Sequence, residues 1–225
     1  MAEAQTHLLV LASNSPRRRE LLALGGWAFN RAAADLNEDV RPGEDAAVYV
    51  ARLAVEKARA ILPHSHPQQV ILGSDTTVVL DGEILGKPAD SGEARLMLTR
   101  LRGRSHQVYT GIAILRASDQ KLLSTVCQTE VPMRHYSDAE MDAYIASGDP
   151  LDKAGAYGIQ HPHFQPVVNM EGCYASVMGL PLCHLTVLLR QWAIQPPADI
   201  AANCQNSLRY ACPVSQFVLQ GNFIK

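Results

Sequence analysis

The sequence predicts an α/β (α+β) fold: a mixed central sheet flanked by helices, with two lobes and a cleft between them. Apolar, β-prone runs alternate with segments of helical periodicity along most of the chain, which is typical of a layered α/β domain. Short hairpin turns in the central third bring antiparallel pairs into the sheet. With 225 residues, 47% of them hydrophobic, the chain can bury one core, as a single domain or a domain with two lobes.

The first elements are a strand over residues 7–12 and a helix that begins at Pro16. Ser15 is a residue type that caps helices, and Pro16 suits the first helical position, where its missing N–H is not needed. A second strand over residues 28–34 follows, and the acidic segment 35–39 is expected to be a loop.

The longest predicted helix covers residues 45–62, carries Lys57 and is ended by Pro63. An apolar strand then runs over residues 70–80 and turns at Asp81-Gly82 into a return strand over residues 83–86. A carboxylate, Asp75, interrupts this apolar strand.

The remaining segments continue the alternation. We expect helices over residues 91–101, 137–147 and 180–192, strands over residues 107–115, 121–131 and 167–170, and a glycine-rich loop over residues 148–158. We assign residues 1–194 to one domain and residues 195–225 to a C-terminal tail of unknown role. The tail has weak periodicity, so a disordered segment, an added strand and a dimer element all stay open.

Composition narrows the function classes. A net charge of −2 argues against a general nucleic-acid binder. The five cysteines form no CxxC pair, which favours reduced thiols over a zinc ribbon or a disulfide framework. No run approaches the roughly 20 apolar residues of a membrane span, and no secretory leader is apparent. We therefore expect a cytoplasmic protein with neither a membrane nor a nucleic acid as partner.

The junction of the first strand and helix is a candidate phosphate site. Backbone N–H groups and the positive end of the helix dipole attract anions, and the hydroxyls of Ser13 and Ser15 and the side chains of Arg17 and Arg18 add donors. The alternative is a capped surface helix with solvated arginines.

Asp75 is the strongest catalytic candidate, because a carboxylate in an apolar strand is poorly solvated and needs a cation or a donor. The alternative is an aspartate that only turns its own backbone. Lys87 and Lys153 lie next to glycines, which let backbone N–H groups approach an anion, and lysine suits phosphate oxygens. Taken singly, each lysine could equally be a solvated surface charge.

Seven segments together resemble the Maf family of nucleoside-triphosphate pyrophosphatases, in order, between residues 7 and 192. They are residues 11–22, 56–58, 74–78, 86–88, 109–111, 149–160 and 177–182.

The resemblance implies a metal-dependent hydrolase that converts a nucleoside triphosphate to the monophosphate and diphosphate, often as a homodimer, in a family associated with septum formation. It implies that Asp75 is the proton acceptor. It implies three substrate-selecting residues: Arg17, Thr76 and Gln160. It further implies polar cleft residues at Ser13, Arg18, Glu38, Lys57, Lys87 and Lys153.

The chemistry of these residues agrees with such roles. Asp75, alone or with Glu38, can hold Mg²⁺ or Mn²⁺ through oxygen ligands, and Asp75 can accept the proton of the attacking water. The lysines and Arg18 can surround the phosphates, without the sequence assigning one lysine to one phosphate. Asn37 stands where relatives often have an acidic residue, so this segment offers a metal one carboxylate fewer near Glu38.

Arg17, Thr76 and Gln160 match the members that resemble dTTP/UTP pyrophosphatases. The amide of Gln160 suits the O4 acceptor and N3–H donor of thymine or uracil and is expected to mismatch cytosine. One alternative is a 7-methyl-GTP or broader nucleotide pyrophosphatase, although no aromatic residue replaces Arg17 to stack on a cationic base. The other is a non-catalytic, nucleotide-binding regulator of septum formation.

Overall fold

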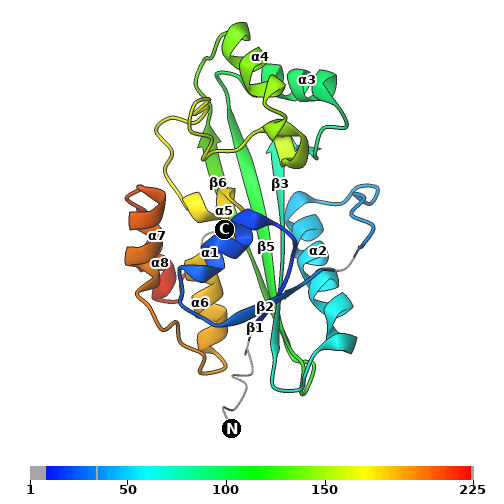
Figure 1. The fold of residues 1–225 in the computed structure, drawn as a ribbon, viewed down its shortest axis with the longest axis vertical. Coiled ribbons are helices and arrows are strands. Elements are labelled where there is room, and N and C mark those ends of the chain that lie inside the picture. Colours follow the sequence, from blue (N-terminus) through cyan, green and yellow to red (C-terminus); the bar gives the residue numbers. More distant parts are fainter. Residues whose placement is uncertain (1–8, 34, 224–225) are drawn as a thin grey trace.

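The computed structural model describes residues 9–33 and 35–223, and its centre is one six-stranded mixed sheet with the strand order β2-β1-β3-β5-β6 (Figure 1). β1 is parallel to β2 and β3, whereas β3, β5 and β6 are antiparallel in sequence, and β4 pairs with the end of β3. The predicted mixed sheet is therefore confirmed. The strands are β1 (Leu9–Ala12), β2 (Phe29–Ala32), β3 (Val70–Leu80), β4 (Glu83–Leu85), β5 (Ser105–Arg116) and β6 (Leu122–Pro132).

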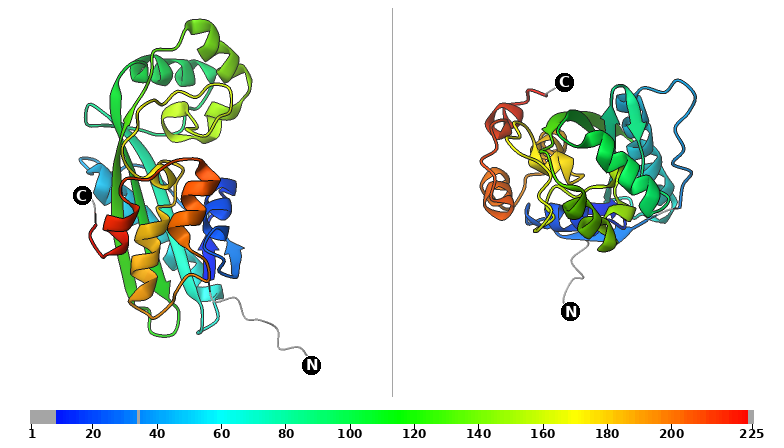
Figure 2. Two further views of the ribbon diagram at one scale, coloured as in Figure 1. Left: turned by 90° about the vertical axis from the view of Figure 1, so that its left-hand side faces the viewer. Right: turned by 90° about the horizontal axis from the view of Figure 1, so that it is seen from above.

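Helices cover both faces of this sheet, with α2 on one face and α1 and α6 on the other (Figures 1 and 2). Single 3-10 turns follow at Leu62–His64, Asp149–Asp152 and Ala154–Ala156. The helices are α1 (Pro16–Ala23), α2 (Ala46–Ile61), α3 (Ser91–Leu101), α4 (Asp138–Ala146), α5 (Tyr174–Val177), α6 (Leu182–Arg190), α7 (Ile200–Leu208) and α8 (Ser215–Leu219). Within the described part of the chain, no helix combines the length and apolar character that a bilayer crossing requires.

The sheet is buried on both faces near β1. Leu9 and Leu11 join the larger core, and Val10 and Ala12 pack in a second cluster with Ala58 of α2. This alternation follows from the period of two along a strand. It explains why the strand reads as an unbroken apolar run.

Two lobes share the long strands. α1, α2 and α6 surround the lower part of the sheet, and α3 and α4 lie over the upper ends of β3, β5 and β6 (Figure 1). The predicted division into two lobes is confirmed.

The local signals read from the sequence set the helix starts. The Ser15 hydroxyl accepts a hydrogen bond from the backbone N–H of Arg18 at 3.4 Å, and Pro16 is the first residue of α1. Asp45 caps α2 by accepting from the backbone N–H of Ala47 at 2.8 Å. Residues 7, 8 and 34 of the two predicted N-terminal strands lie outside the described residues.

One predicted strand is wrong, and one predicted helix is present but shorter. Residues 167–170 do not form a strand: the described chain has a single bridge there, between Met133 and Val167, and Asn169 has a φ of 51°. A left-handed residue turns the chain out of the extended conformation, which ends any ladder. The helix predicted over residues 180–192 is shorter, and the preceding short helix α5 was not predicted.

Residues beyond 194 form α7 and α8 rather than an added strand. Ile200 and Val218 are buried, and the indole N–H of Trp27 donates to the carbonyl oxygen of Gln195 at 3.1 Å. Asn203 also donates to the carbonyl oxygen of Leu24 at 2.9 Å. These contacts attach the segment to α1 and its following turn. The domain boundary at residue 194 stays a prediction.

Protonation of His106 should link stability to pH. This buried residue of β5 has its Nε2 atom 2.7 Å from the hydroxyl of Tyr157, and burial lowers its pKa from 6.5 to about 4. Below pH 6.5 the unfolded chain takes up the proton first, so stability present above pH 6.5 is lost as the pH falls toward 4. Between pH 7 and pH 4.5 this amounts to roughly 2 kcal/mol.

Urea unfolding of the wild type and of His106→Gln at the two pH values measures this effect. Carboxylates contribute equally to both proteins, so the wild type should lose more stability than the variant by that difference. Parallel losses would show that His106 is not neutral in the folded protein.

Candidate active site

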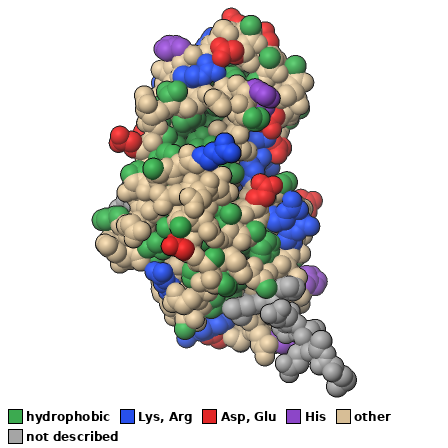
Figure 3. All heavy atoms as spheres, turned by 60° about the vertical axis from the view of Figure 1, so that its left-hand side comes forward, with side chains coloured by type: hydrophobic (Ala, Val, Ile, Leu, Met, Phe, Trp, Pro, Cys, Tyr) green, Lys and Arg blue, Asp and Glu red, His purple; other side chains and the backbone are tan. Residues whose placement is uncertain are grey.

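A cleft of about 620 Å³ lies between the two lobes and is lined by segments far apart in the sequence. Its walls come from the segment after β1, from the middle of β3, from the loop after β4 and from residues 152–160 of the upper lobe. Basic side chains mark this waist of the molecule in the space-filling view (Figure 3). All ten residues singled out from the sequence line the cleft: Ser13, Arg17, Arg18, Glu38, Lys57, Asp75, Thr76, Lys87, Lys153 and Gln160.

Asp75 lies on β3 at the centre of the cleft and is only 6% exposed. The ammonium of Lys57, which α2 holds above the strand, is 2.6 Å from Oδ1 of Asp75 and 2.6 Å from Oε1 of Glu38. Burial raises the pKa of Asp75, and the charges of Lys57 and Arg18 oppose this only in part. Asp75 therefore binds protons more tightly than an ordinary aspartate.

Glu38 behaves differently, although the same ammonium contacts it. Burial acts to raise its pKa, but the hydrogen bond and the charge of Lys57 outweigh it and lower the pKa of Glu38. The two carboxylates thus contact the same positively charged group, the ammonium of Lys57. Such oxygen donors also fit a hard divalent cation, which often takes one or two carboxylates from the protein and the rest of its ligands from phosphates and water.

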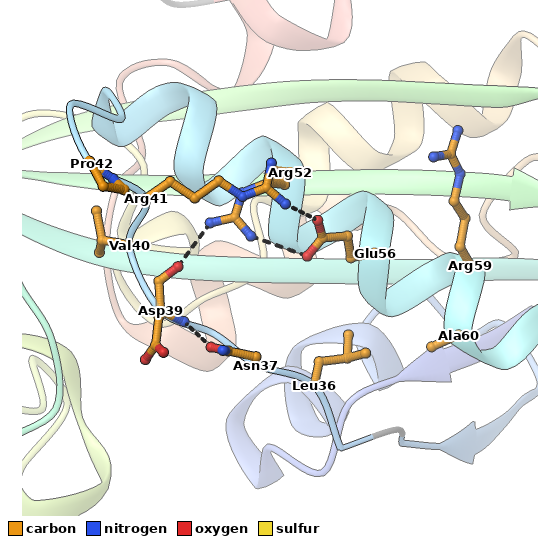
Figure 4. Close-up of a pocket in the computed structure, with 10 residues that line it drawn as sticks. All are labelled: Leu36, Asn37, Asp39, Val40, Arg41, Pro42, Arg52, Glu56, Arg59 and Ala60. Atoms are coloured by element: carbon orange, nitrogen blue, oxygen red, sulfur yellow. Dashed lines mark hydrogen bonds and ion pairs between the residues drawn. The ribbon is translucent and has the colours of Figure 1, made fainter.

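The segment that carries Glu38 is anchored to α2 from behind the cleft. Arg52 donates to the carbonyl oxygen of Asp39 at 3.1 Å and to Glu56 at 3.1 Å, beside a groove of about 700 Å³ (Figure 4). The hydroxyl of Tyr49 donates to the carbonyl oxygen of Glu38 at 2.8 Å. The position of Glu38 is therefore fixed through its backbone.

Arg18 is half-buried in the cleft wall and contacts three elements. Its Nε donates to the carbonyl oxygen of Gly179 at 2.9 Å, and its two terminal nitrogens donate to Ser13 at 3.4 Å and to Thr76 at 3.2 Å. Burial lowers the pKa of Arg18, and the charge of Asp75 opposes this shift. Most of the N–H groups of Arg18 already donate to other residues of the protein. A contact between Arg18 and phosphate stays a prediction.

Acidic side chains of the upper lobe pair with two of the basic residues of the cleft. Lys153 is buried, and its ammonium donates to Oδ1 of Asp149 at 2.8 Å and Oδ1 of Asp152 at 2.6 Å. Arg17 reaches Asp152 from the lower lobe at 3.4 Å. Across residues 9–33 and 35–223, Lys87 and Gln160 make no side-chain hydrogen bond, so both side chains can turn toward a ligand.

Sequence reasoning missed several residues that support these groups, namely Tyr49, Asp149, Asp152 and Thr110. Thr110 pairs with Thr76 across β3 and β5, and their hydroxyl oxygens are 2.9 Å apart. The antiparallel register of the two strands was the missing information, since the residue types alone give no reason to pair these threonines.

Comparisons with known proteins show which proteins this chain is similar to. A family model described as Maf-like protein matches residues 8–192. The dTTP/UTP pyrophosphatase of Hahella chejuensis is 50% identical over 193 residues, covering 85% of this chain and 95% of that protein. The dTTP/UTP pyrophosphatase of Chromobacterium violaceum is 47% identical over 193 residues, covering 84% and 96%.

Among solved structures, a nucleoside-triphosphatase/dITP/XTP pyrophosphatase from Mycobacterium abscessus matches with 13% identity and a TM-score of 0.41, covering 83% of this chain and 98% of that one. The sequence comparisons, which span nearly the full length of the relatives, identify the family. This chain belongs to the Maf family.

Proposed function

We propose that this chain is a nucleoside triphosphate pyrophosphatase that hydrolyses dTTP and UTP to the monophosphate and diphosphate. The relatives with about half of their residues identical to it carry that name. The observation that carries the proposal is the cleft itself. One buried carboxylate, Asp75, lies among the basic side chains of two lobes, which is what water attack on a triphosphate requires.

In the proposed reaction, water attacks the α-phosphorus and the bond to the diphosphate breaks. Asp75 accepts the proton of the attacking water, and its raised pKa makes it a stronger base than an ordinary aspartate. Lys57 is bonded to Asp75 and holds the carboxylate in position. The leaving diphosphate gains negative charge, which the ammonium groups of Lys87 and Lys153 can stabilise.

A divalent cation, Mg²⁺ or Mn²⁺, belongs to the proposal. Asp75 and Glu38 would hold it through the carboxylate oxygens that Lys57 does not contact, since Lys57 brings the two carboxylates together. When bound, it would supply positive charge to the triphosphate. A homodimer, which rests on the family resemblance, and a cytoplasmic location, which rests on the composition, are further parts of the proposal.

A substrate panel tests this function. With Mg²⁺ or Mn²⁺ present, dTTP and UTP should release diphosphate, and CTP, ATP, GTP and 7-methyl-GTP should give kcat/KM values lower by roughly 100-fold. Gln160→Ala should flatten the preference over the purine nucleotides, because the amide proposed to contact the base is gone. A preference for 7-methyl-GTP would favour the first alternative, and binding without any turnover would favour a non-catalytic regulator.

A further inference from the structure

Three hydrogen bonds connect the side chain of Thr76 in the cleft to its surroundings. The hydroxyl of Thr110 lies 2.8 Å from the carbonyl oxygen of Ser176, and 2.9 Å from the hydroxyl of Thr76. Arg18 donates to the same Thr76 oxygen at 3.2 Å. Thr110 is fully buried, so no water competes for its hydroxyl.

The direction of each bond in this chain can be deduced. A carbonyl oxygen only accepts, so the single proton of the Thr110 hydroxyl is directed at Ser176. The Thr110 oxygen must then accept from Thr76, whose own proton is thereby used. Arg18 occupies one lone pair of the Thr76 oxygen. What Thr76 still offers to the cleft is one lone pair, and it acts there as an acceptor only.

A fixed acceptor matters because Gln160 is not fixed. Its amide carries a donor and an acceptor side by side, and a half-turn of the amide exchanges them. Within the described part of the chain the Gln160 amide has no hydrogen-bond partner, so it can donate to O4 of uracil or thymine or, after the turn, accept from the N4 amino group of cytosine. Gln160 alone does not separate the two bases. A group whose donor or acceptor sense cannot change is required.

We infer that Thr110 is a positioning residue that locks Thr76 as an acceptor and thereby sets the preference for uracil and thymine over cytosine. In this arrangement the N3–H of uracil or thymine donates to Thr76, and the Gln160 amide pairs with the O4 atom. Cytosine presents a lone pair at N3, which would face the lone pair of Thr76 and leave both unpaired. The inference rests on the proposed function, and it adds a residue that does not itself touch the substrate.

Thr110→Val removes the acceptor of the Thr76 proton with little change in side-chain shape, and so tests the inference. Valine cannot accept the Thr76 proton, so Thr76 becomes free to donate to N3 of cytosine. The carbonyl oxygen of Ser176 keeps its hydrogen bond from the backbone N–H of Gly179 at 2.9 Å. We expect kcat/KM for CTP to rise and the UTP:CTP ratio to fall by about 10-fold or more. Thr110→Ser keeps the hydroxyl and should keep the wild-type ratio within about 2-fold.

Calorimetric titration with UMP and CMP gives a second readout that does not depend on turnover. Thr110→Val should strengthen CMP binding relative to UMP, and Thr110→Ser should not. Equal losses for both nucleotides would mean that Thr110 is only structural, and this would overturn the inference. Thr110→Ala serves as the second variant if the valine variant does not fold, with the same expected ratio.

The failure of the inference and that of the proposed function are distinguishable. A wild type that does not prefer UTP and dTTP overturns the proposed function, and the inference with it. A wild type with that preference, and with an unchanged ratio in both Thr110→Val and Thr110→Ala, overturns the inference alone.

Discussion

Asp75→Asn is expected to lower kcat for dTTP by about 100-fold or more, the scale seen when a general base is removed. The amide has nearly the same shape as the carboxylate but neither accepts a proton nor offers a negative charge to a cation. Lys57 keeps its contact with Glu38, at 2.6 Å, so the cleft retains one of the two ion pairs at this point. Nucleotide affinity should therefore stay within a few-fold of the wild type.

Steady-state kinetics and calorimetric titration with dTMP separate these two effects. Asp81→Asn is the matched control, because it makes the same chemical change just beyond the end of β3, in an exposed ion pair with Arg104. Asp81 has a φ of 53°, a conformation that asparagine also adopts readily. If Asp75→Asn retained near-full activity, Asp75 would not be the base.

Gly111→Ala is expected to destabilise the protein by on the order of 3 kcal/mol, or to prevent folding, since it overpacks a backbone contact. Gly111 lies on β5 directly beneath α2. A Cβ there would lie closer to the Val50 carbonyl oxygen than van der Waals contact allows, and a Cβ at Gly73 on β3 would meet the Ala54 carbonyl in the same way. These are backbone atoms of a helix, so they cannot rotate away as a side chain would.

Urea unfolding measures the loss, with Gly86→Ala as its control. A Cβ at Gly86 meets no atom within 4 Å, and its φ lies outside the left-handed region, so its free energy of unfolding should change by less than about 0.5 kcal/mol. Gly73 and Gly111 let α2 lie close to the sheet. Because α2 carries Lys57, this close packing also keeps Lys57 in contact with Asp75. A Gly111→Ala protein as stable as the wild type would show that α2 can move outward freely.

Much of the fold was readable because it is encoded locally. Ser15 followed by Pro16 placed the start of α1, and the apolar spacing of residues 45–62 placed α2 to within about a residue. The strand 167–170 was mispredicted because the left-handed conformation of Asn169 depends on its surroundings. An apolar stretch without its neighbours does not reveal such a turn.

In the candidate site, too, the residue types could be predicted from the sequence, whereas the contacts between them could not. The residue types of Asp75 and Lys57 suggested chemistry, but their 2.6 Å contact depends on α2 packing across the sheet. The position of β1 between β2 and β3 is likewise a pairing of distant segments, which local patterns do not specify. Thr110 was overlooked for this reason, since its proposed role depends on Thr76, which lies opposite it on β3.

The three long strands that both lobes share have a mechanical consequence for the cleft. β3 and β5 stay paired without interruption from Val70 opposite Arg116 to Val79 opposite Gln107, so no flexible joint separates the lobes (Figure 2). A hinge would break this ladder, whereas a twisted ribbon can wind or unwind while its hydrogen bonds persist. We therefore expect the width of the cleft to change with the twist of the sheet. Substitutions on the outer strand β6 that stiffen the ribbon would act on nucleotide entry from a distance, with no contact to the nucleotide.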